Sequence, residues 1–292
     1  FIARSVDDLP TMVAEAFRLA RSGRPRPVLI DLPKDVQMAD ATHLPAYASL
    51  GRDPAEPPKD ASLHEALALV SQAQRPVVYG GGGIVLGEAV QAFRTFVDAT
   101  QIPTVLTLKG LGALPTAHPL NLGMLGMHGS RAANLAVQEA DLLIVVGARF
   151  DDRATGKLAE FAPFARVLHV DADAYEIGKL RTADIAVPGE VATSLKALTA
   201  ERSTCDEWRK RCVGNRERFG FRYDAPGTDI YAPGLLKRLS EVAPADAIIA
   251  CDVGQHQMWV AQHCKFNHPR NHLTSGALGT MGFGLPAAMG AQ

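Results

Sequence analysis

The stretch DVGQHQMWVAQHCKFNHPRNHLTSGALGTMGFGLPAAMGAQ, residues 252–292, decides the fold. The apolar run AIIACDV, residues 247–253, is expected to be a strand, and the stretch begins at the end of this run. The stretch closes in a helix with Pro286 in its first turn, where proline is tolerated. Gly282, Gly284 and Ala287 satisfy G-x-G-x-x-G/A, but the preceding HLTS is a poor strand, so we interpret the match as a false dinucleotide fingerprint. The glycines still predict that the backbone closely approaches another group.

Both ends of the sequence look cut. Helix formers follow Pro286 without a stop signal, and the chain opens at Phe1 with an amphipathic pattern over residues 7–22 that no strand precedes. We therefore expect an internal piece of a longer protein. The default location is cytoplasmic, and an organelle-targeting segment ahead of Phe1 stays open.

Short apolar runs alternate with helical periodicities along most of the chain. We expect strands at residues 27–33, 76–79, 104–108, 142–146, 167–170, 185–187 and 247–253. We expect helices near residues 7–22, 62–73, 87–99, 129–139, 174–180, 191–201, 207–219 and 233–241. This alternation predicts an α/β fold of three-layer, doubly wound parallel-sheet domains, in which ligands bind at the carboxyl ends of the strands.

Composition shifts divide the chain into five segments. Residues 1–40 close one α/β domain, and residues 41–60 form a linker containing Pro54, Pro57 and Pro58. A complete central domain follows at 61–203. Residues 204–231 form a linker helix and a Pro/Gly turn, Ala225–Gly227. The first part of a third domain occupies 232–292.

Composition also limits the function classes. The 292 residues are 47 % hydrophobic and carry a formal net charge of -1, without a basic run, so we expect neither a nucleic-acid partner nor a membrane. The four cysteines lack Cys-x-x-Cys spacing, which argues against a disulfide framework or a zinc site. We predict no metal ligand within this chain.

Glycines and acids mark the expected carboxyl ends of two strands. Gly80–Gly83 follow PVVY, where a backbone without Cβ atoms can approach a phosphate or flavin, although a tight turn without ligand is equally compatible. Asp171 and Asp173 end VLHV, where acids can bind ribose hydroxyls, and a helix N-cap is the alternative for Asp173. Together the two clusters favour an adenosine-containing ligand.

The run GARFDDR, residues 147–153, places four charges just past an apolar strand. An internal salt-bridge cluster is one interpretation, since unpaired charges are costly there. The alternative places Arg149 at a dinucleotide and Arg153 at a small carboxylate, which a guanidinium matches with two hydrogen bonds. His128 and His256 lie in glycine-flanked loops suited to a site, whereas His268 and His272 are interpreted as surface residues.

Taken together, RPVVYGGGG, LGMLGMHG, GARFDDR, DVGQHQMW and LTSGALGTMGFGLPAA resemble the large catalytic subunits of the acetolactate synthase (acetohydroxyacid synthase) family of thiamine-diphosphate enzymes. The resemblance covers essentially the whole chain. It implies the end of a pyrimidine-binding domain, a whole FAD domain and the start of a diphosphate-binding domain.

The resemblance also implies an activity. Such an enzyme decarboxylates pyruvate on Mg²⁺-dependent thiamine diphosphate and adds the two-carbon unit to a second 2-keto acid, in branched-chain amino acid biosynthesis, while FAD does no net redox work. It implies a homodimer or homotetramer and a possible small regulatory subunit. A non-catalytic FAD-binding module and a related carboligase, such as glyoxylate carboligase, are the alternatives.

Site residues follow from the resemblance position by position. Arg153 is expected at the carboxylate of the second keto acid, and Met281 where an apolar side chain bends the thiamine. The remaining cofactor-binding residues, flavin side first, are Arg24, Gly81, Gly82, Gly83, Thr107, Leu108, His128, Gly147, Ala148, Arg149, Asp171 and Asp173, and then Gln255, His256, Gln257, Met258, Gly276, Gly279 and Met281.

Two residues depart from the family pattern. Arg26 replaces the glycine of RPGP, and Ala277 replaces a glycine of SGGLG; a Cβ there is costly if φ is positive or a cofactor lies close. The activating glutamate is expected upstream of Phe1 and the GDG-to-Asn magnesium motif beyond Gln292. We therefore expect the isolated chain neither to hold magnesium thiamine diphosphate nor to turn over pyruvate.

Overall fold

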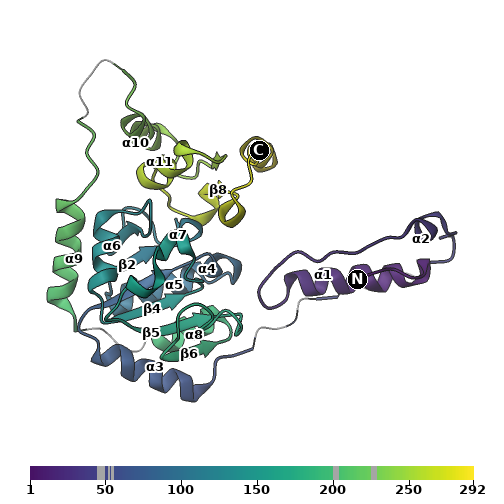
Figure 1. Ribbon diagram of the computed structural model, residues 1–292, viewed down its shortest axis with the longest axis horizontal. Coiled ribbons are helices and arrows are strands. Elements are labelled where there is room, and N and C mark those ends of the chain that lie inside the picture. Colours follow the sequence, from purple (N-terminus) through teal and green to yellow (C-terminus); the bar gives the residue numbers. More distant parts are fainter. Residues whose placement is uncertain (45–49, 52, 54–55, 200–203, 225–228) are drawn as a thin grey trace. The chain divides into compact units, whose positions relative to one another are not determined.

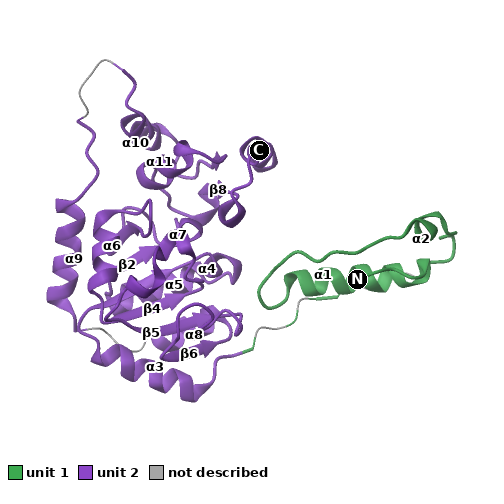
Figure 2. Ribbon diagram, in the orientation of Figure 1, with its two compact units in different colours: residues 1–56 green, residues 57–292 purple. Residues whose placement is uncertain are grey.

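The computed structural model describes residues 1–44, 50, 51, 53, 56–199, 204–224 and 229–292. The chain divides into two compact units, Phe1–Glu56 and Pro57–Gln292 (Figure 2). The boundary falls within the predicted linker at 41–60. Pro54, the end of the predicted helix 191–201 and the predicted turn Ala225–Gly227 lie outside the described residues.

The first unit is built around one helix. A short 3-10 turn, η1 (Val6–Asp8), leads into α1 (Leu9–Arg21), and α2 (Lys34–Met38) follows an extended segment. The predicted strand at 27–33 is wrong, because the segment makes only one parallel bridge, Ile2 with Asp31. Prolines 27 and 33 lack an N–H, and Leu29 is 75 % exposed, so the segment is neither paired nor buried like a central strand.

The second unit contains a six-stranded parallel sheet in the order β3-β2-β1-β4-β5-β6. Its strands are β1 (Pro76–Gly80), β2 (Thr104–Leu106), β3 (Asn121–Met124), β4 (Leu142–Val146), β5 (Arg166–Asp171) and β6 (Ile185–Pro188). This order confirms the doubly wound α/β prediction. β3 was missed because NLGM is short and contains a glycine that weakens the strand signal.

Helices cover both faces of this sheet (Figure 1). One layer consists of α3 (Asp60–Gln72), α5 (Val90–Thr100) and α8 (Val191–Leu198), and the other contains α6 (Arg131–Glu139) and α9 (Asp206–Arg218). All five residues of β4 are buried, as expected for a central strand with helices on each side. Trp208 fixes α9 by donating its indole N–H to the carbonyl of Pro76 at 3.0 Å.

Short helical turns follow several strands. They are α4 (Gly83–Leu86), η2 (Leu108–Gly110), α7 (Asp152–Thr155) and η3 (Leu158–Glu160). The predicted helix at 174–180 is wrong, since these residues form consecutive turns. Asp173 accepts the N–H of Tyr175 at 3.1 Å, and Gly178 adopts φ 76°, so side-chain turn chemistry replaces the helix.

A second, two-stranded parallel sheet lies in the C-terminal part of the unit. Its elements are α10 (Ala232–Val242), β7 (Ile249–Cys251), α11 (Gln255–His263), η4 (Pro269–Asn271), β8 (His272–Thr274), η5 (Gly276–Leu278) and α12 (Gly284–Ala291). The poor strand HLT therefore does form a strand, because it pairs with Ile249–Cys251 along its full length. The surface assignment of His272 is wrong as well, as the residue is buried.

The two loops at the switch between β1 and β4 interlock through their backbones. Gly81 donates its N–H to Val146, and Gly83 to Gly147, both at 2.9 Å. A Cβ on Gly81 would lie 2.3 Å from the carbonyl oxygen of Gly147, and one on Gly83 would lie 2.6 Å from the Cα of Gly147. Gly147 itself adopts φ 58°, so the loop contact needs glycine on both sides.

We predict that Gly81→Ala destabilises the protein by at least about 2 kcal/mol, because the added methyl group displaces backbone rather than a movable side chain. Gly214→Ala is the matched control: nothing lies within 4 Å of its Cβ position in the interior of α9, so it stabilises by about 1 kcal/mol. Urea unfolding measures both changes. Equal stability of Gly81→Ala and the parent would contradict the interlock.

Candidate functional site

The predicted flavin residues of the central domain line one edge of the large sheet. In sheet order, His128 lies after β3, Thr107 and Leu108 after β2, Gly81–Gly83 after β1, Gly147–Arg149 after β4, and Asp171 and Asp173 at the end of β5. The carboxyl ends of parallel strands share an edge, so positions spread over nearly a hundred residues become neighbours. The structure brings this set together.

The β2 loop packs tightly against the β1 loop. Thr107 donates its N–H to Gly80 at 2.9 Å, and its hydroxyl accepts the N–H of Gly110 at 3.1 Å. A Cβ on Gly82 would lie 3.0 Å from the Cβ of Lys109. The glycines at 81–83 thus have a structural role in loop packing, and the binding of a cofactor there stays a prediction.

The β4 loop turns its charges outward on a strained backbone. Gly147 and Phe150 both have positive φ, 58° and 56°. Ala148 and Phe150 are buried, and the ring of Phe150 packs edge-on against Tyr79 at 5.7 Å between centroids. This anchoring leaves Arg149 exposed at the edge.

Only part of the charged run GARFDDR pairs internally. Arg149 contacts Asp151 at 3.4 Å, and both side chains are about four-tenths exposed. Asp151 caps α7 by accepting the N–H of Arg153 at 3.1 Å. Among the described residues the guanidinium of Arg153 has no ion-pair partner, which leaves it able to bind an added carboxylate.

The acids after β5 are buried and organised by their own backbone. Asp171 is 8 % exposed and Asp173 9 %. Asp171 accepts the N–H of Asp173 at 2.8 Å, and its carbonyl accepts the N–H of Gly189 at 3.0 Å. Asp173 begins a turn, so the helix N-cap alternative is wrong.

Loops after β3 and β4 are joined to each other and to α11. Met127 donates its N–H to the carbonyl of Arg153 at 2.9 Å, and Gln262 of α11 donates to the carbonyl of His128 at 2.9 Å. Both His128 and Arg153, placed by the sequence in different segments, are therefore held at the same end of the sheet.

The predicted thiamine residues of the C-terminal sheet occupy two neighbouring segments. Gln255, His256, Gln257 and Met258 form the first turn of α11, after Gly254. Gln257 donates to the hydroxyl of Thr274 at 2.6 Å and so connects this turn to the end of β8. Gly276 and Gly279 adopt φ 71° and 59°, and Met281 beyond them is 81 % exposed.

Asp252 fixes the far end of this glycine-rich segment. Its carboxylate accepts the N–H groups of Gly282 at 3.0 Å and Gly284 at 2.8 Å, and that of Val253 at 2.8 Å. These hydrogen bonds, that of Gly284 first, lower the pKa of Asp252 below its usual value. The acid at the end of β7 thus holds the start of α12.

The two departures from the family pattern cause no left-handed strain. Arg26 and Ala277 are both exposed, and neither has a positive φ. The expected cost from positive φ is therefore absent at both positions. Arg24 lies in the first unit, half-buried, after Gly23 with φ 54°. Its assignment to a flavin stays a prediction.

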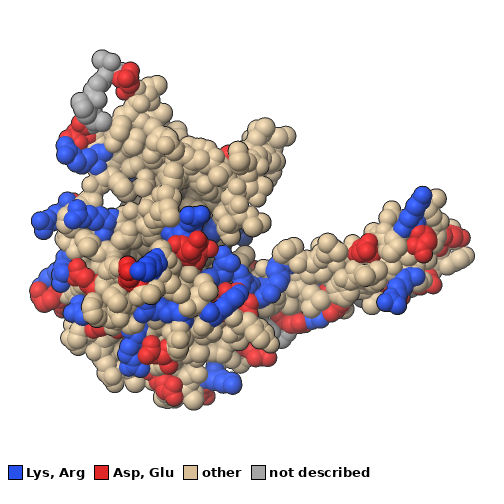
Figure 3. Space-filling view, viewed as in Figure 1, with Lys and Arg blue, Asp and Glu red and all other residues tan. Residues whose placement is uncertain are grey.

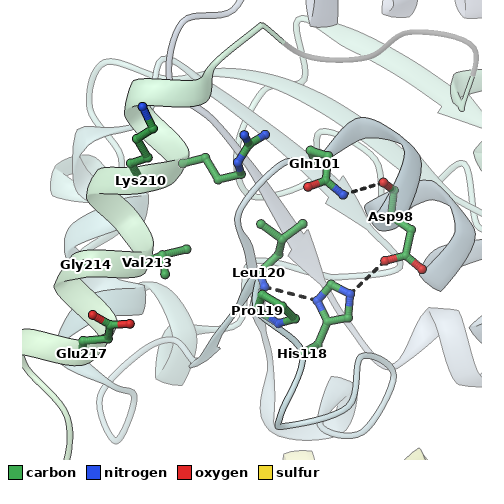
Figure 4. Close-up of a pocket in the computed structure, with 10 residues that line it drawn as sticks. Asp98, Gln101, His118, Pro119, Leu120, Lys210, Val213, Gly214 and Glu217 are labelled. Carbon is green, nitrogen blue, oxygen red and sulfur yellow. Dashed lines mark hydrogen bonds and ion pairs between the residues drawn. The ribbon is translucent and has the colours of Figure 1, made fainter.

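A cavity of about 440 Å³ lies at the opposite, amino end of β2 and β3 (Figure 4). It is lined by Asp98, Gln101, His118, Pro119, Leu120, Arg209, Lys210, Val213, Gly214 and Glu217. His118 points its Nε2 at Asp98, 2.9 Å away, while its Nδ1 accepts the N–H of Leu120 at 3.2 Å. The histidine and its aspartate are thus engaged with each other, and none of the predicted site residues lines this cavity.

Charges of both signs are interspersed on the face of the molecule drawn in Figure 3. Within the described ranges, no helix is long and apolar enough to cross a membrane, and no group of three or more His, Cys, Asp or Glu residues could hold a metal ion. The four cysteines are buried free thiols, and burial raises the pKa of Cys251 to about 11.

Two profiles of one enzyme family match the chain in order. The thiamine pyrophosphate enzyme central domain matches residues 63–198, which contain the large sheet, and its C-terminal TPP binding domain matches residues 252–292. The chain belongs to the thiamine pyrophosphate enzyme family. The resemblance drawn from the sequence motifs is confirmed.

Relatives within the thiamine pyrophosphate enzymes match over the whole chain. It is 51 % identical to the acetolactate synthase isozyme 2 large subunit of Escherichia coli over 292 residues and 45 % identical to the isozyme 1 large subunit over 295 residues. The acetolactate synthase large subunit of Lactococcus lactis is 45 % identical over 99 % of the chain. The chain spans about half the length of these relatives, 53 %, 52 % and 51 %.

Sequence reasoning missed the roles of three residues of this thiamine pyrophosphate enzyme: Asp252 and Lys109, which lie at the candidate site, and His272, which is part of the core. Asp252 lies at the end of an expected strand. The same kind of position identified Asp171 as a candidate, so the sequence did contain a signal for Asp252. Lys109 and His272 gave no such signal, because their neighbours across the sheets come from distant segments. His272 stacks on Phe266 with ring centroids 4.7 Å apart and belongs to the core.

His272 makes stability depend on pH. Burial, followed by the nearby charge of Lys109, lowers its pKa to about 4, below the value of about 6.5 expected in the unfolded chain. The unfolded chain therefore binds the proton first, and stability falls as the pH drops from about 6.5 towards 4. The loss approaches roughly 3 kcal/mol, at about 1.4 kcal/mol per pKa unit.

His272→Phe, which keeps a stacking ring but cannot bind a proton, is expected to flatten this dependence. Urea unfolding between about pH 7 and 4.5, followed by tryptophan fluorescence, measures it. Replacement of the exposed His64 by Gln is the control and should leave the slope unchanged. An unaltered slope in His272→Phe would show that another group titrates.

Proposed function

We propose that the protein containing this chain is the catalytic large subunit of an acetolactate synthase. It decarboxylates pyruvate and joins the two-carbon unit to a second 2-keto acid, in branched-chain amino acid biosynthesis. The observation that carries this proposal is the match of acetolactate synthase large subunits over the whole chain. The predicted flavin residues of the central domain also gather at the carboxyl edge of the large sheet, and the predicted thiamine residues gather beside the two-stranded sheet.

The carboxyl edge of the large sheet is proposed to bind FAD. Support comes from the switch point between β1 and β4, where dinucleotides bind in doubly wound sheets. Arg149 is exposed and suited to a phosphate, and Asp171 and Asp173 present carboxylates suited to ribose hydroxyls. Thr107, Leu108 and His128 border the same edge and belong to the proposed flavin set.

Thiamine diphosphate is proposed to bind beside α11 and the segment 276–281. Gln255 and His256 lie at the N-terminal turn of a nine-residue helix, where N–H groups favour phosphate oxygens. Gly276 and Gly279 keep the backbone free of Cβ atoms, and Met281 offers an exposed apolar side chain. When bound, this cofactor supplies the carbanion chemistry for decarboxylation, and Mg²⁺ binds its diphosphate.

Arg153 is proposed to hold the carboxylate of the second keto acid. Its guanidinium is exposed, while its backbone is fixed on both sides by Asp151 and Met127. A fixed backbone with an unpaired guanidinium can orient a small carboxylate through two hydrogen bonds. Orientation of the acceptor is the contribution that this chain would make to the joining step.

The assembly and location of the whole protein are proposed from the same family relationship. We infer a homodimer or homotetramer, a small regulatory subunit as partner, and a cytoplasmic location. The relatives' names support the small subunit, because each is called a large subunit.

We predict that the chain binds FAD and that Arg149→Gln weakens binding about tenfold or more, as expected for the loss of a charge-assisted hydrogen bond. Arg166→Gln is the matched control, because Arg166 forms a similar exposed pair with Asp184 at 3.3 Å, at the amino end of β5. Flavin fluorescence titration measures both dissociation constants. An equal loss of FAD affinity in the two variants, or no loss in Arg149→Gln, would contradict the proposed binding of FAD at this edge.

In the whole protein, Arg153→Gln is expected to raise KM for the second keto acid by about ten- to a hundredfold, because one charged contact to a carboxylate is lost. Pyruvate decarboxylation should change far less. Lys157→Gln, four residues away and exposed, is the control. A loss of decarboxylation equal to the loss of product formation would place Arg153 elsewhere in the reaction.

A further inference from the structure

Lys109 lies between the two predicted cofactor regions. It is the middle residue of η2, directly after Thr107 and Leu108 of the proposed flavin edge. Its ammonium group donates to the carbonyl of Thr274 at 2.9 Å, at the end of β8 and next to the proposed thiamine segment. One side chain thus connects segments 165 residues apart in the sequence.

Two glycines make room for the stem of this lysine. A Cβ on Gly82 would lie 3.0 Å from the Cβ of Lys109, and one on Gly276 would lie 2.9 Å from its Cδ. Gly82 belongs to the flavin edge, whereas Gly276, with φ 71°, opens the segment proposed to meet thiamine. The stem therefore packs against both regions, and burial lowers the pKa of Lys109.

Thr274 is held from two sides. Lys109 binds its carbonyl from the large sheet, and Gln257 of α11 binds its hydroxyl at 2.6 Å. Beyond Thr274, the segment is next fixed by Asp252 at Gly282. The hydrogen bonds between these two points are local, from Gly279 to the carbonyl of Gly276 at 3.2 Å and from Thr280 to the hydroxyl of Ser275 at 3.0 Å. The contact with Lys109 thus sets where the exposed stretch 276–281 begins.

We infer that Lys109 is a positioning residue that couples the flavin edge to the thiamine segment. Ordering of the β1 and β2 loops by flavin fixes Lys109, and Lys109 in turn fixes Thr274 and Gly276. Coupling of this kind is reciprocal, so thiamine bound at 276–281 also favours flavin. The inferred coupling rests on the proposed function, whereas the contact of Lys109 with Thr274 does not.

Hydrogen–deuterium exchange of the chain without cofactor tests the contact. Lys109→Met keeps the stem between the glycines and removes the donor, so amides in 274–281 should exchange about tenfold faster, while β4 is unchanged. Lys109→Arg, which restores a donor, should recover much of the protection. Lys210→Met removes an exposed lysine and serves as the control. Unchanged exchange at 274–281 in Lys109→Met would overturn the inference.

The same experiment with saturating FAD tests the coupling. In the parent, FAD should slow exchange at 81–83 and also at 274–281; in Lys109→Met only the first effect should remain. Slowing at both places in the variant would overturn the coupling. A parent in which FAD slows exchange nowhere would contradict the proposed flavin function, and the coupling with it, while the cofactor-free comparison still decides whether Lys109 holds Thr274.

Discussion

The backbone interlock between the β1 and β4 loops is the constraint on which the rest of the structure depends. Gly81 and Gly83 lie against Gly147 so closely that no side chain fits between them. This contact brings the two central strands of the sheet to one level at their carboxyl ends. The flanking loops, which carry Thr107 on one side and Asp171 on the other, then continue the same edge.

The interlock also gives the glycines after β1 a role different from the one that the sequence suggests. In the sequence, GGGG after an apolar strand suggests a backbone that must approach a phosphate. In the structure, Gly81 and Gly83 donate their N–H groups to Val146 and Gly147, so those amides serve the protein. The flavin surface that we propose consists instead chiefly of the exposed Arg149 and of the carboxylates of Asp171 and Asp173 at the end of β5.

Much of the fold could be predicted from the sequence because its strands are apolar and its helices periodic. LLIVV at β4 is an example, since a wholly apolar run of this length with three β-branched residues suits a strand buried on both faces. The failures have physical causes. The segment at 27–33 makes only a single bridge, and β3 and β8 acquire strand structure only through pairing. Residues 174–180 form turns because the carboxylate of Asp173 accepts the N–H of Tyr175. His272 and Lys109 could not be foreseen, because their environments are made by residues far away in the chain.

We propose that the carboxyl edge of the large sheet, rather than the cavity beside α9, binds the flavin. A crystal structure of the chain with FAD is the most direct test. The dinucleotide is expected to lie across the switch between β1 and β4, with a phosphate within reach of Arg149 and a ribose near Asp171. Flavin found between α9 and His118, at the amino end of the sheet, would contradict it.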